Sequence, residues 1–321
     1  MSIETIEGPI LTTACHIKGP SPTCPLFILV PGNPGLAQFY SKYLDSLKGK
    51  LPKFELFALS LLGFSTTAVE RKKYDPNLRV HTLQEQIDHI FELTKSLVAN
   101  EEKKPRDLYI SGHSVGAWIA QRVAVRVKDL ASVNLKFVGL LTPTIKDIAL
   151  SERGVKFTRL AKYLQIDFLG ARLLQALNWL VPVAGLQMVV RFIVGSDVET
   201  HAHAVACELA TRPQFARQAI GMAVEEMKLI DGATYPPDIG DFWEQHQTYK
   251  IWAFFAYRDH WIADSTRKEL ADEFDTRGNV EFIHMDATSN ISHNFCVTNS
   301  ELVADYTVKA MESVDKNIRS S

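Results

Sequence analysis

The sequence predicts an α/β fold in which a mostly parallel sheet is flanked by helices on both faces. Two observations predict it: short apolar runs of strand length, and helical periodicity in the segments between them. The expected strands are residues 25–32, 53–63, 106–111, 135–143, 250–257 and 279–285. Strands that alternate with helices in this way form parallel sheets covered on both sides.

The expected helices lie between these strands and after the last one. Residues 84–98 place Ile87, Ile90 and Phe91 on one face at helical spacing. A second helix is expected directly after Ser114. The terminal segment "NSELVADYTVKAMESV" begins with capping residues and predicts an amphipathic helix.

The alternation of strands and helices breaks between about residues 146 and 248, which read as helices and loops. We therefore expect a core made of residues 1–145 and 249–321, with residues 146–248 inserted as a helical cap. No internal repeat or low-complexity tract is visible.

The apolar centre of this insertion, residues 168–195, allows several interpretations. A membrane span needs about 20 largely uncharged residues, and Arg172 and Arg191 bracket a shorter run that Pro182 interrupts. A span is not favoured. Two interpretations remain open: a cap packed on the core, or a helical hairpin whose apolar face dips into a lipid surface. The lipid-contacting residues would then be Trp179, Leu180 and Val181.

Composition and termini exclude other classes of protein. The 321 residues carry a formal net charge of -2, which gives no general electrostatic footprint for nucleic acid. Four scattered cysteines form no CxxC pair and indicate a reducing compartment rather than a disulfide framework. The N-terminus has no secretory signal pattern and the C-terminus no targeting or prenylation motif, so a cytosolic location is expected. The oligomeric state is not predictable.

The segment "LYISGHSVGAW" carries the strongest chemical signal. Its Gly-x-Ser-x-Gly pattern lies between an expected strand and an expected helix, the context of a nucleophile elbow. Gly112 and Gly116 are expected to be small because strand and helix approach closely there. Ser114 would then project above the carboxyl ends of the strands as the nucleophile.

A serine nucleophile needs a base and an acid that orients the base. In α/β hydrolases these follow in the order Ser, Asp or Glu, then His. Asp259 in "FFAYRDHW" follows an expected strand, and His293 in "SNISHNF" follows the last one. We expect His293 to accept the proton of Ser114 and Asp259 to fix the tautomer of His293.

Several other residues compete for these roles. Asp264 and Asp147 are the rival acids, the second because it also follows an expected strand. His260 adjoins the acid and is a poor base, while His284 lies in a strand pattern that favours a core histidine. His113 is the variable elbow residue and is expected to be structural.

An oxyanion hole requires two backbone N–H donors. Val115, directly after the nucleophile, supplies one. The other is expected from the loop "VPGNPG", where Pro31 and Pro34 have no N–H, so Asn33 is the natural donor. An ordinary Pro-Gly turn is the alternative.

The stretch "HAHAVAC" raises the question of a metal. Only His203 and Cys207 have the i,i+4 spacing that places two side chains on one helix face. Zinc sites generally need three or four protein ligands, so a helix surface is favoured over a metal site. Serine ester hydrolysis needs neither a metal nor an organic cofactor.

Taken together, "FILVPGNPGLAQFY", "GHSVGA", "LLTPTI", "AYRDHW" and "SHNF" resemble the lipid droplet-associated hydrolases, α/β-hydrolase fold proteins of fungi and animals. The similarity runs from about residue 26 to the terminal helix and is weakest across the insertion. His260 departs from a pattern with proline after the aspartate. The family's catalytic residues fall on Ser114, Asp259 and His293.

The resemblance implies hydrolysis of sterol esters or acylglycerols at the surface of lipid droplets, with the endoplasmic reticulum and cytosol as further locations. Acyl-chain length and the physiological substrate stay open. One alternative function is a lipid-droplet surface protein with little or no catalysis. Another is a soluble esterase or thioesterase for short acyl groups.

Overall fold

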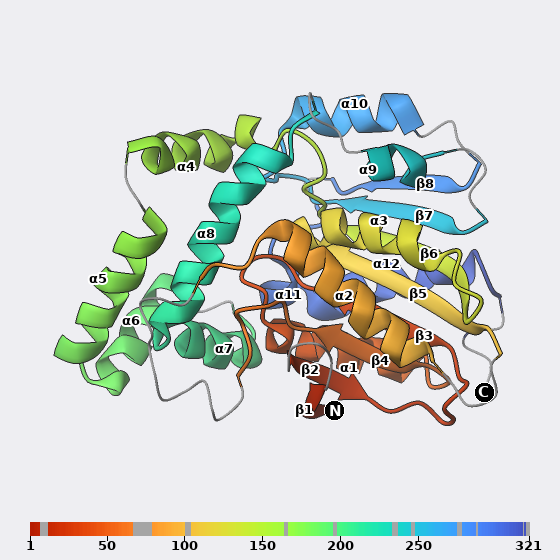
Figure 1. Ribbon diagram of the computed structural model, residues 1–321, viewed down its shortest axis with the longest axis horizontal. Coiled ribbons are helices and arrows are strands. Elements are labelled where there is room, and N and C mark those ends of the chain that lie inside the picture. The colour runs from red at the N-terminus through yellow and green to blue at the C-terminus, as the bar shows by residue number, and fades with distance from the viewer. Residues whose placement is uncertain are drawn as a thin grey trace.

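A twisted sheet of eight strands forms the centre of the part of the chain that the structure describes (Figure 1). The computed structural model describes residues 1–6, 12–66, 79–99, 104–163, 166–194, 198–232, 237–244, 248–274, 278–286, 288–316 and 318. The strand order is β1-β2-β4-β3-β5-β6-β7-β8. The strands are β1 (Ser2–Ile6), β2 (Thr12–Ile17), β3 (Leu26–Val30), β4 (Glu55–Leu59), β5 (Arg106–His113), β6 (Val133–Leu141), β7 (Lys250–Phe255) and β8 (Val280–His284).

The sheet confirms the predicted fold class. From β4 to β8 every pairing of neighbouring strands is parallel. The antiparallel strands β1 and β2 at one edge are not among the sequence predictions. Strand β1 is mostly exposed, and β2 is buried but its sequence TTACHI contains no long apolar run. The carboxyl ends of the parallel strands therefore meet at one edge of the sheet, where such folds bind ligands.

Helices cover both faces of the sheet and extend beyond it at one end. They are η1 (Ala37–Tyr40), α1 (Ser41–Lys50), α2 (Leu83–Val98), α3 (Val115–Val127), η3 (Ile148–Leu150), α4 (Glu152–Tyr163), α5 (Ile166–Leu180), α6 (Val183–Val194), α7 (Thr200–Ala210), α8 (Pro213–Leu229), α9 (Pro237–Phe242), α10 (Asp264–Phe274), α11 (Phe295–Thr298) and α12 (Ser300–Glu312).

Two apolar cores lie on opposite faces of the sheet. On one face α2, α3, α9 and α10 bury aliphatic and aromatic side chains, Trp118 and Trp243 among them. On the other face α1 and α12 pack together over the sheet around Tyr43 and Phe295. Local signals fix where these helices begin: Thr82 and Glu85 form a capping box at the start of α2.

Between β6 and β7 the chain forms helices, of which α4–α8 lie together beside the sheet (Figure 1). Helix α5 packs on α8, and α6 packs on α7. The last of these helices, α9, packs instead on α3 over the sheet. Pro182 separates α5 from α6. Among the described residues, none of the helices is both long and apolar enough to cross a bilayer.

Candidate active site

A strained turn joins β5 to α3 and carries Ser114. The backbone of Ser114 has φ 54° and ψ -125°, a conformation that non-glycine residues rarely adopt. Hydrogen bonds on both sides hold it: its N–H donates to the Leu141 carbonyl at 3.0 Å, and its carbonyl accepts from the Ala117 N–H at 2.9 Å. Such strain persists only where the surrounding structure imposes it, and it is concentrated at functional sites.

The two glycines of the turn lie where no side chain fits. A Cβ atom on Gly112 would lie 2.2 Å from the carbonyl oxygen of Gly116. A Cβ atom on Gly116 would lie 2.3 Å from the carbonyl oxygens of Pro31 and Val30. The close approach of β5, α3 and the end of β3 therefore requires glycine at both positions.

His293 lies between Ser114 and Asp259. Its Nε2 is 3.0 Å from the Ser114 Oγ, and its Nδ1 is 2.7 Å from the Asp259 Oδ2. The other carboxylate oxygen of Asp259 accepts a hydrogen bond from the Trp261 N–H at 2.8 Å. Since the carboxylate can only accept, His293 carries its proton on Nδ1, and Nε2 is free to accept from the serine hydroxyl. The loops after β5, β7 and β8 bring the three side chains together.

The rival acids lie in other contacts. Asp264 stands at the start of α10 and pairs with Arg267. Asp147 accepts a hydrogen bond from the Gly232 N–H at 2.8 Å. The partner of the His293 imidazole is therefore Asp259, the expected one of the three.

Two of the rival histidines, His260 and His284, make contacts with other residues. The exposed His260 is 2.7 Å from a Glu152 carboxylate oxygen. The expectation of a core histidine at His284 is wrong: β8 is an edge strand, and His284 is exposed there, with its ring stacked on Phe255.

A buried chain of hydrogen bonds ties three loops of the site together. The Gly32 N–H donates to the Tyr40 hydroxyl oxygen at 2.9 Å, and this hydroxyl lies 2.6 Å from the Nδ1 of His113. The His113 Nε2 lies 2.9 Å from the carbonyl oxygen of His293, which also accepts from the Thr142 hydroxyl at 3.1 Å. The loop after β3, the elbow and the base are thus held in one network.

The protonation of His113 fits this network. Burial, reinforced by the neighbouring His293, lowers the pKa of His113 to about 3, so the ring is neutral. A neutral imidazole has one donor and one acceptor. Nε2–H then donates to the His293 carbonyl and Nδ1 accepts from the Tyr40 hydroxyl. Burial also raises the pKa of Tyr40 and keeps its hydroxyl protonated.

The two expected oxyanion donors lie close to Ser114. Val115 is the first residue of α3, so its N–H has no partner within the helix. Gly32, the neighbour of Asn33, packs on the serine: a Cβ atom on Gly32 would lie 3.1 Å from that of Ser114. Neither the Asn33 nor the Val115 N–H donates to another group in the described ranges of the chain.

The side chain of Asn33 anchors this loop to α8. Its Nδ2 donates to the Ala219 carbonyl at 2.8 Å and to the Glu226 Oε1 at 3.0 Å. Glu226 is buried, and burial raises its pKa to about 8, with a smaller contribution from Glu225. A neutral carboxyl group therefore links the loop to the inserted helices at neutral pH.

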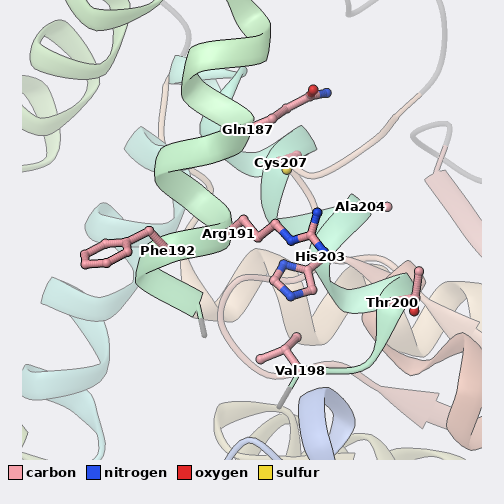
Figure 2. A pocket seen from close by; sticks show the side chains of 8 residues that line it. All are labelled: Gln187, Arg191, Phe192, Val198, Thr200, His203, Ala204 and Cys207. Atoms are coloured by element: carbon pink, nitrogen blue, oxygen red, sulfur yellow. The ribbon is translucent and has the colours of Figure 1, made fainter. Parts of the chain in front are cut away.

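The residues of "HAHAVAC" lie on α7, beside a cavity of about 670 Å³ (Figure 2). His203 and Cys207 line this cavity together with Arg191 of α6. His201 points elsewhere, with its Nε2 3.0 Å from the Phe39 carbonyl oxygen. Among the described residues, His, Cys, Asp and Glu side chains form no group of three that could hold a metal ion.

The inserted helices expose a large apolar surface, here called the α5–α6 face. The predicted lipid-contacting residues lie on it: Trp179 is 90% exposed and Leu180 75%, while Val181 is half-buried. Other exposed apolar side chains on these helices are Leu169, Leu173, Leu177, Met188, Val189 and Phe192. So many large apolar side chains exposed on two successive helices are typical of an interaction surface.

Three residues of the site carry no role in the sequence predictions: Tyr40, Thr142 and Glu226. Tyr40 ends the motif "PGNPGLAQFY", which is the signal that could have identified it. Thr142 is recognisable only by its distance from His293, and Glu226 only by its contact with Asn33, far away in sequence.

The parallel sheet, the strained serine turn and the flanking helices define the α/β-hydrolase fold, and solved structures share it. One, from a study of carboxylesterases of Nitrososphaera gargenis, has 14% identity and a TM-score of 0.61 over 98% of this chain and 100% of that one. The 2-hydroxy-6-oxo-6-phenylhexa-2,4-dienoate hydrolase of Rhodococcus sp. strain RHA1 has 15% identity and a TM-score of 0.59, covering 97% and 100% of the two chains.

The chain belongs to the lipid-droplet associated hydrolase family, whose model matches residues 23–296. It is 32% identical over 141 residues to the lipid droplet-associated hydrolase of Rattus norvegicus, a match that covers 40% of each chain. The Dictyostelium discoideum protein of that name is 27% identical over 46% of this chain and 51% of its own length. The matches thus span about half or less of these two relatives.

Proposed function

We propose that the chain is a serine hydrolase that cleaves lipid esters. One observation carries the proposal: the imidazole of His293 bridges the hydroxyl of Ser114 and the buried carboxylate of Asp259. This is the geometry of an activated serine nucleophile. Family membership and the names of the relatives support hydrolysis and a lipid setting.

Acylation begins with attack of the Ser114 Oγ on the ester carbonyl carbon while His293 Nε2 takes the hydroxyl proton. The carbonyl π electrons move to the oxygen, and the N–H groups of Asn33 and Val115 donate to this oxyanion. Collapse breaks the bond to the alcohol oxygen, which takes the proton from His293. The alcohol leaves, and the acyl group stays on Ser114.

Deacylation repeats these steps with water. His293 takes a proton from water as its oxygen attacks the acyl carbonyl, and collapse returns that proton to Ser114 and releases the fatty acid. Asp259 stabilises the imidazolium formed in each half-reaction and keeps the Nδ1 proton in place.

We place this reaction at the surface of lipid droplets. The relatives are named for droplet association. The apolar side chains of Trp179, Leu180 and Val181 on the α5–α6 face are available to contact a lipid surface. Burial of a large apolar side chain stabilises such binding by about 1.5–3 kcal/mol. Sterol esters and acylglycerols are the substrate classes that droplets contain in bulk.

Hydrolysis of dispersed lipid esters tests the proposal. Purified protein is given emulsions of cholesteryl oleate and of triolein, and p-nitrophenyl butyrate as a soluble ester, with Ser114→Ala as the control. We expect fatty acid release from at least one emulsion, abolished in the control. Hydrolysis of p-nitrophenyl butyrate alone would favour a soluble short-chain esterase or thioesterase.

A second candidate function is a lipid-droplet surface protein that organises droplets with little or no catalysis. The exposed α5–α6 face favours it, because droplet binding needs no nucleophile. Under this alternative, Ser114→Ala leaves the effect of the protein on droplet size unchanged, whereas loss of the face abolishes it.

A further inference from the structure

A cavity of about 340 Å³ lies among the inserted helices beside the loop that carries Asn33. Its lining comes from that loop and from α5, α6, α7 and α8, and each lining residue is apolar. Pro34, Leu174, Val190, Ala206, Leu209 and Ala219 are among them. A cavity of this size is within the range of small-molecule sites. Water is poorly held in it, because an ordered water needs two to four polar partners.

The cavity adjoins the loop that carries the proposed oxyanion donor Asn33. Gly32 packs against Ser114, Asn33 follows it as the proposed donor, and Pro34 lines the cavity. A second link runs through α8: the Asn33 side chain donates to the carbonyl of Ala219, which also lines the cavity. A substrate carbonyl held at the Asn33 N–H would therefore lie next to Pro34, a residue that lines this cavity.

We infer that the cavity is the subsite for the acyl chain of the ester, an inference that rests on the proposed serine hydrolase function. The acyl group stays bonded to Ser114 through both half-reactions, whereas the alcohol leaves after the first. A hydrocarbon chain satisfies an entirely apolar lining and gains free energy with each methylene that it buries.

The larger cavity between α6 and α7 differs in chemistry. Figure 2 shows Arg191, His203 and Thr200 around it, so polar and charged groups share its lining with apolar side chains such as Phe192 and Val198. An alkyl chain placed there would take water from these groups without replacing their hydrogen bonds. Different residues of α7 line the two cavities, which allows a matched comparison.

Residue size on α7 sets the capacity of the acyl subsite. Ala206 lines the apolar cavity and Ala204, two residues earlier, lines the larger one. A phenyl ring in place of Ala206 fills space that the acyl chain would occupy, and the same ring at Ala204 does not. Neither residue belongs to the proposed catalytic machinery.

The test compares hydrolysis of p-nitrophenyl palmitate and p-nitrophenyl butyrate by wild type, Ala206→Phe and Ala204→Phe. For Ala206→Phe we expect kcat/KM on the palmitate to fall about tenfold or more with the butyrate value retained. Ala204→Phe should leave the ratio of the two substrates unchanged. An unchanged ratio in Ala206→Phe would overturn the assignment.

A binding measurement separates this inference from catalysis. Ser114→Ala protein, alone or with either phenylalanine substitution, is titrated with the fluorescent fatty acid cis-parinaric acid. We expect Ala206→Phe to weaken binding about tenfold or more and Ala204→Phe to leave it unchanged. Equal binding by all three proteins contradicts the subsite even where the wild type hydrolyses esters. If the wild type hydrolyses no ester, selective loss of binding in Ala206→Phe still supports the cavity.

Discussion

The residues around Ser114, here called the elbow region, and the inserted helices differ in where they place polar and apolar side chains. Around Ser114 the polar side chains of His113, Tyr40 and His293 are buried, and hydrogen bonds join Tyr40 to His113 and His113 to the carbonyl oxygen of His293. On the α5–α6 face, large apolar side chains such as Phe192, 89% exposed, lie in solvent. Both arrangements are unfavourable in isolation: buried polar groups need partners, and exposed apolar patches need a surface to cover them.

The difference assigns separate tasks to the two regions. The elbow region has its hydrogen-bond partners within the chain, so its geometry is fixed before substrate arrives, as chemistry requires. No described part of the chain covers the exposed side chains of the α5–α6 face, and we propose that a lipid surface covers them. Asn33 connects the two regions, because its backbone belongs to the elbow region and its side chain donates hydrogen bonds to residues of α8.

The largest expected effect comes from the acid of the elbow region. Asp259→Asn keeps the size of the side chain but stabilises the wrong imidazole tautomer, and we expect kcat to fall by about 10⁴-fold. Steady-state hydrolysis of p-nitrophenyl butyrate measures it. Asp264→Asn, the matched change in the rival acid, should retain near wild-type activity. The reverse result would assign the acid to Asp264.

Removing apolar groups from the α5–α6 face should weaken lipid binding without changing the hydrolysis of a soluble ester. Trp179→Ser with Phe192→Ser removes two exposed aromatic side chains, so binding to triolein emulsions should weaken by about a hundredfold or more, at about 1.5–3 kcal/mol for each side chain. Flotation of the emulsion measures binding. Hydrolysis of p-nitrophenyl butyrate should not change.

Leu302→Ser is the control for this experiment, since Leu302 is also exposed but lies on α12, on the sheet. It should float with the emulsion as the wild type does. Unaltered flotation of the double variant would contradict the role of the face.

The carboxyl group of Glu226, which accepts a hydrogen bond from Asn33, should make the free energy of unfolding depend on pH. Because burial raises its pKa to about 8, the folded protein retains a proton there that the unfolded chain releases above the ordinary carboxyl pKa. The free energy of unfolding should therefore fall as pH rises from about 5 to about 8, by about 1.4 kcal/mol per pH unit from this group.

Glu226→Gln removes this dependence, since the amide oxygen can still accept from Asn33 and has no proton to release. Urea unfolding of both proteins across this pH range measures the slopes. Equal slopes in wild type and variant would show that the carboxyl group is not buried in the folded protein.

The smallest expected effect concerns the buried chain of hydrogen bonds that runs from Gly32 through Tyr40 and His113 to His293. Tyr40→Phe leaves the Gly32 N–H and the His113 Nδ1 without their partner, which should lower the free energy of unfolding by about 1–3 kcal/mol. Because the chain ends on the carbonyl of His293, kcat should fall with little change in KM. Thermal unfolding with steady-state kinetics measures both, and a variant with wild-type stability would contradict the network.

The sequence predicts those parts of the molecule that local patterns determine. Buried strands carry apolar runs, and the Ser114 elbow needs small residues at fixed positions, so both are readable from the chain. Asp259 and His293 follow from chain order and strand ends. The edge strand β1 escapes prediction because its side chains are exposed, and the contact of Glu226 with Asn33 depends on folding that brings distant segments together.

The exposure of the α5–α6 face is also beyond local patterns. Residues 168–195 are apolar in any interpretation, and periodicity does not say which face a neighbour covers. Packing of α5 on α8 and α6 on α7 decides it. Trp179 is left in solvent by that packing.

Labelling with a fluorophosphonate probe, in the presence of detergent, tests the central claim most directly. Wild-type protein should form a covalent adduct that peptide mass spectrometry assigns to Ser114, Ser114→Ala should form none, and His293→Ala should react far more slowly. A folded wild type that takes up no probe, or an adduct on another residue, would contradict the claim that Ser114 is an activated nucleophile.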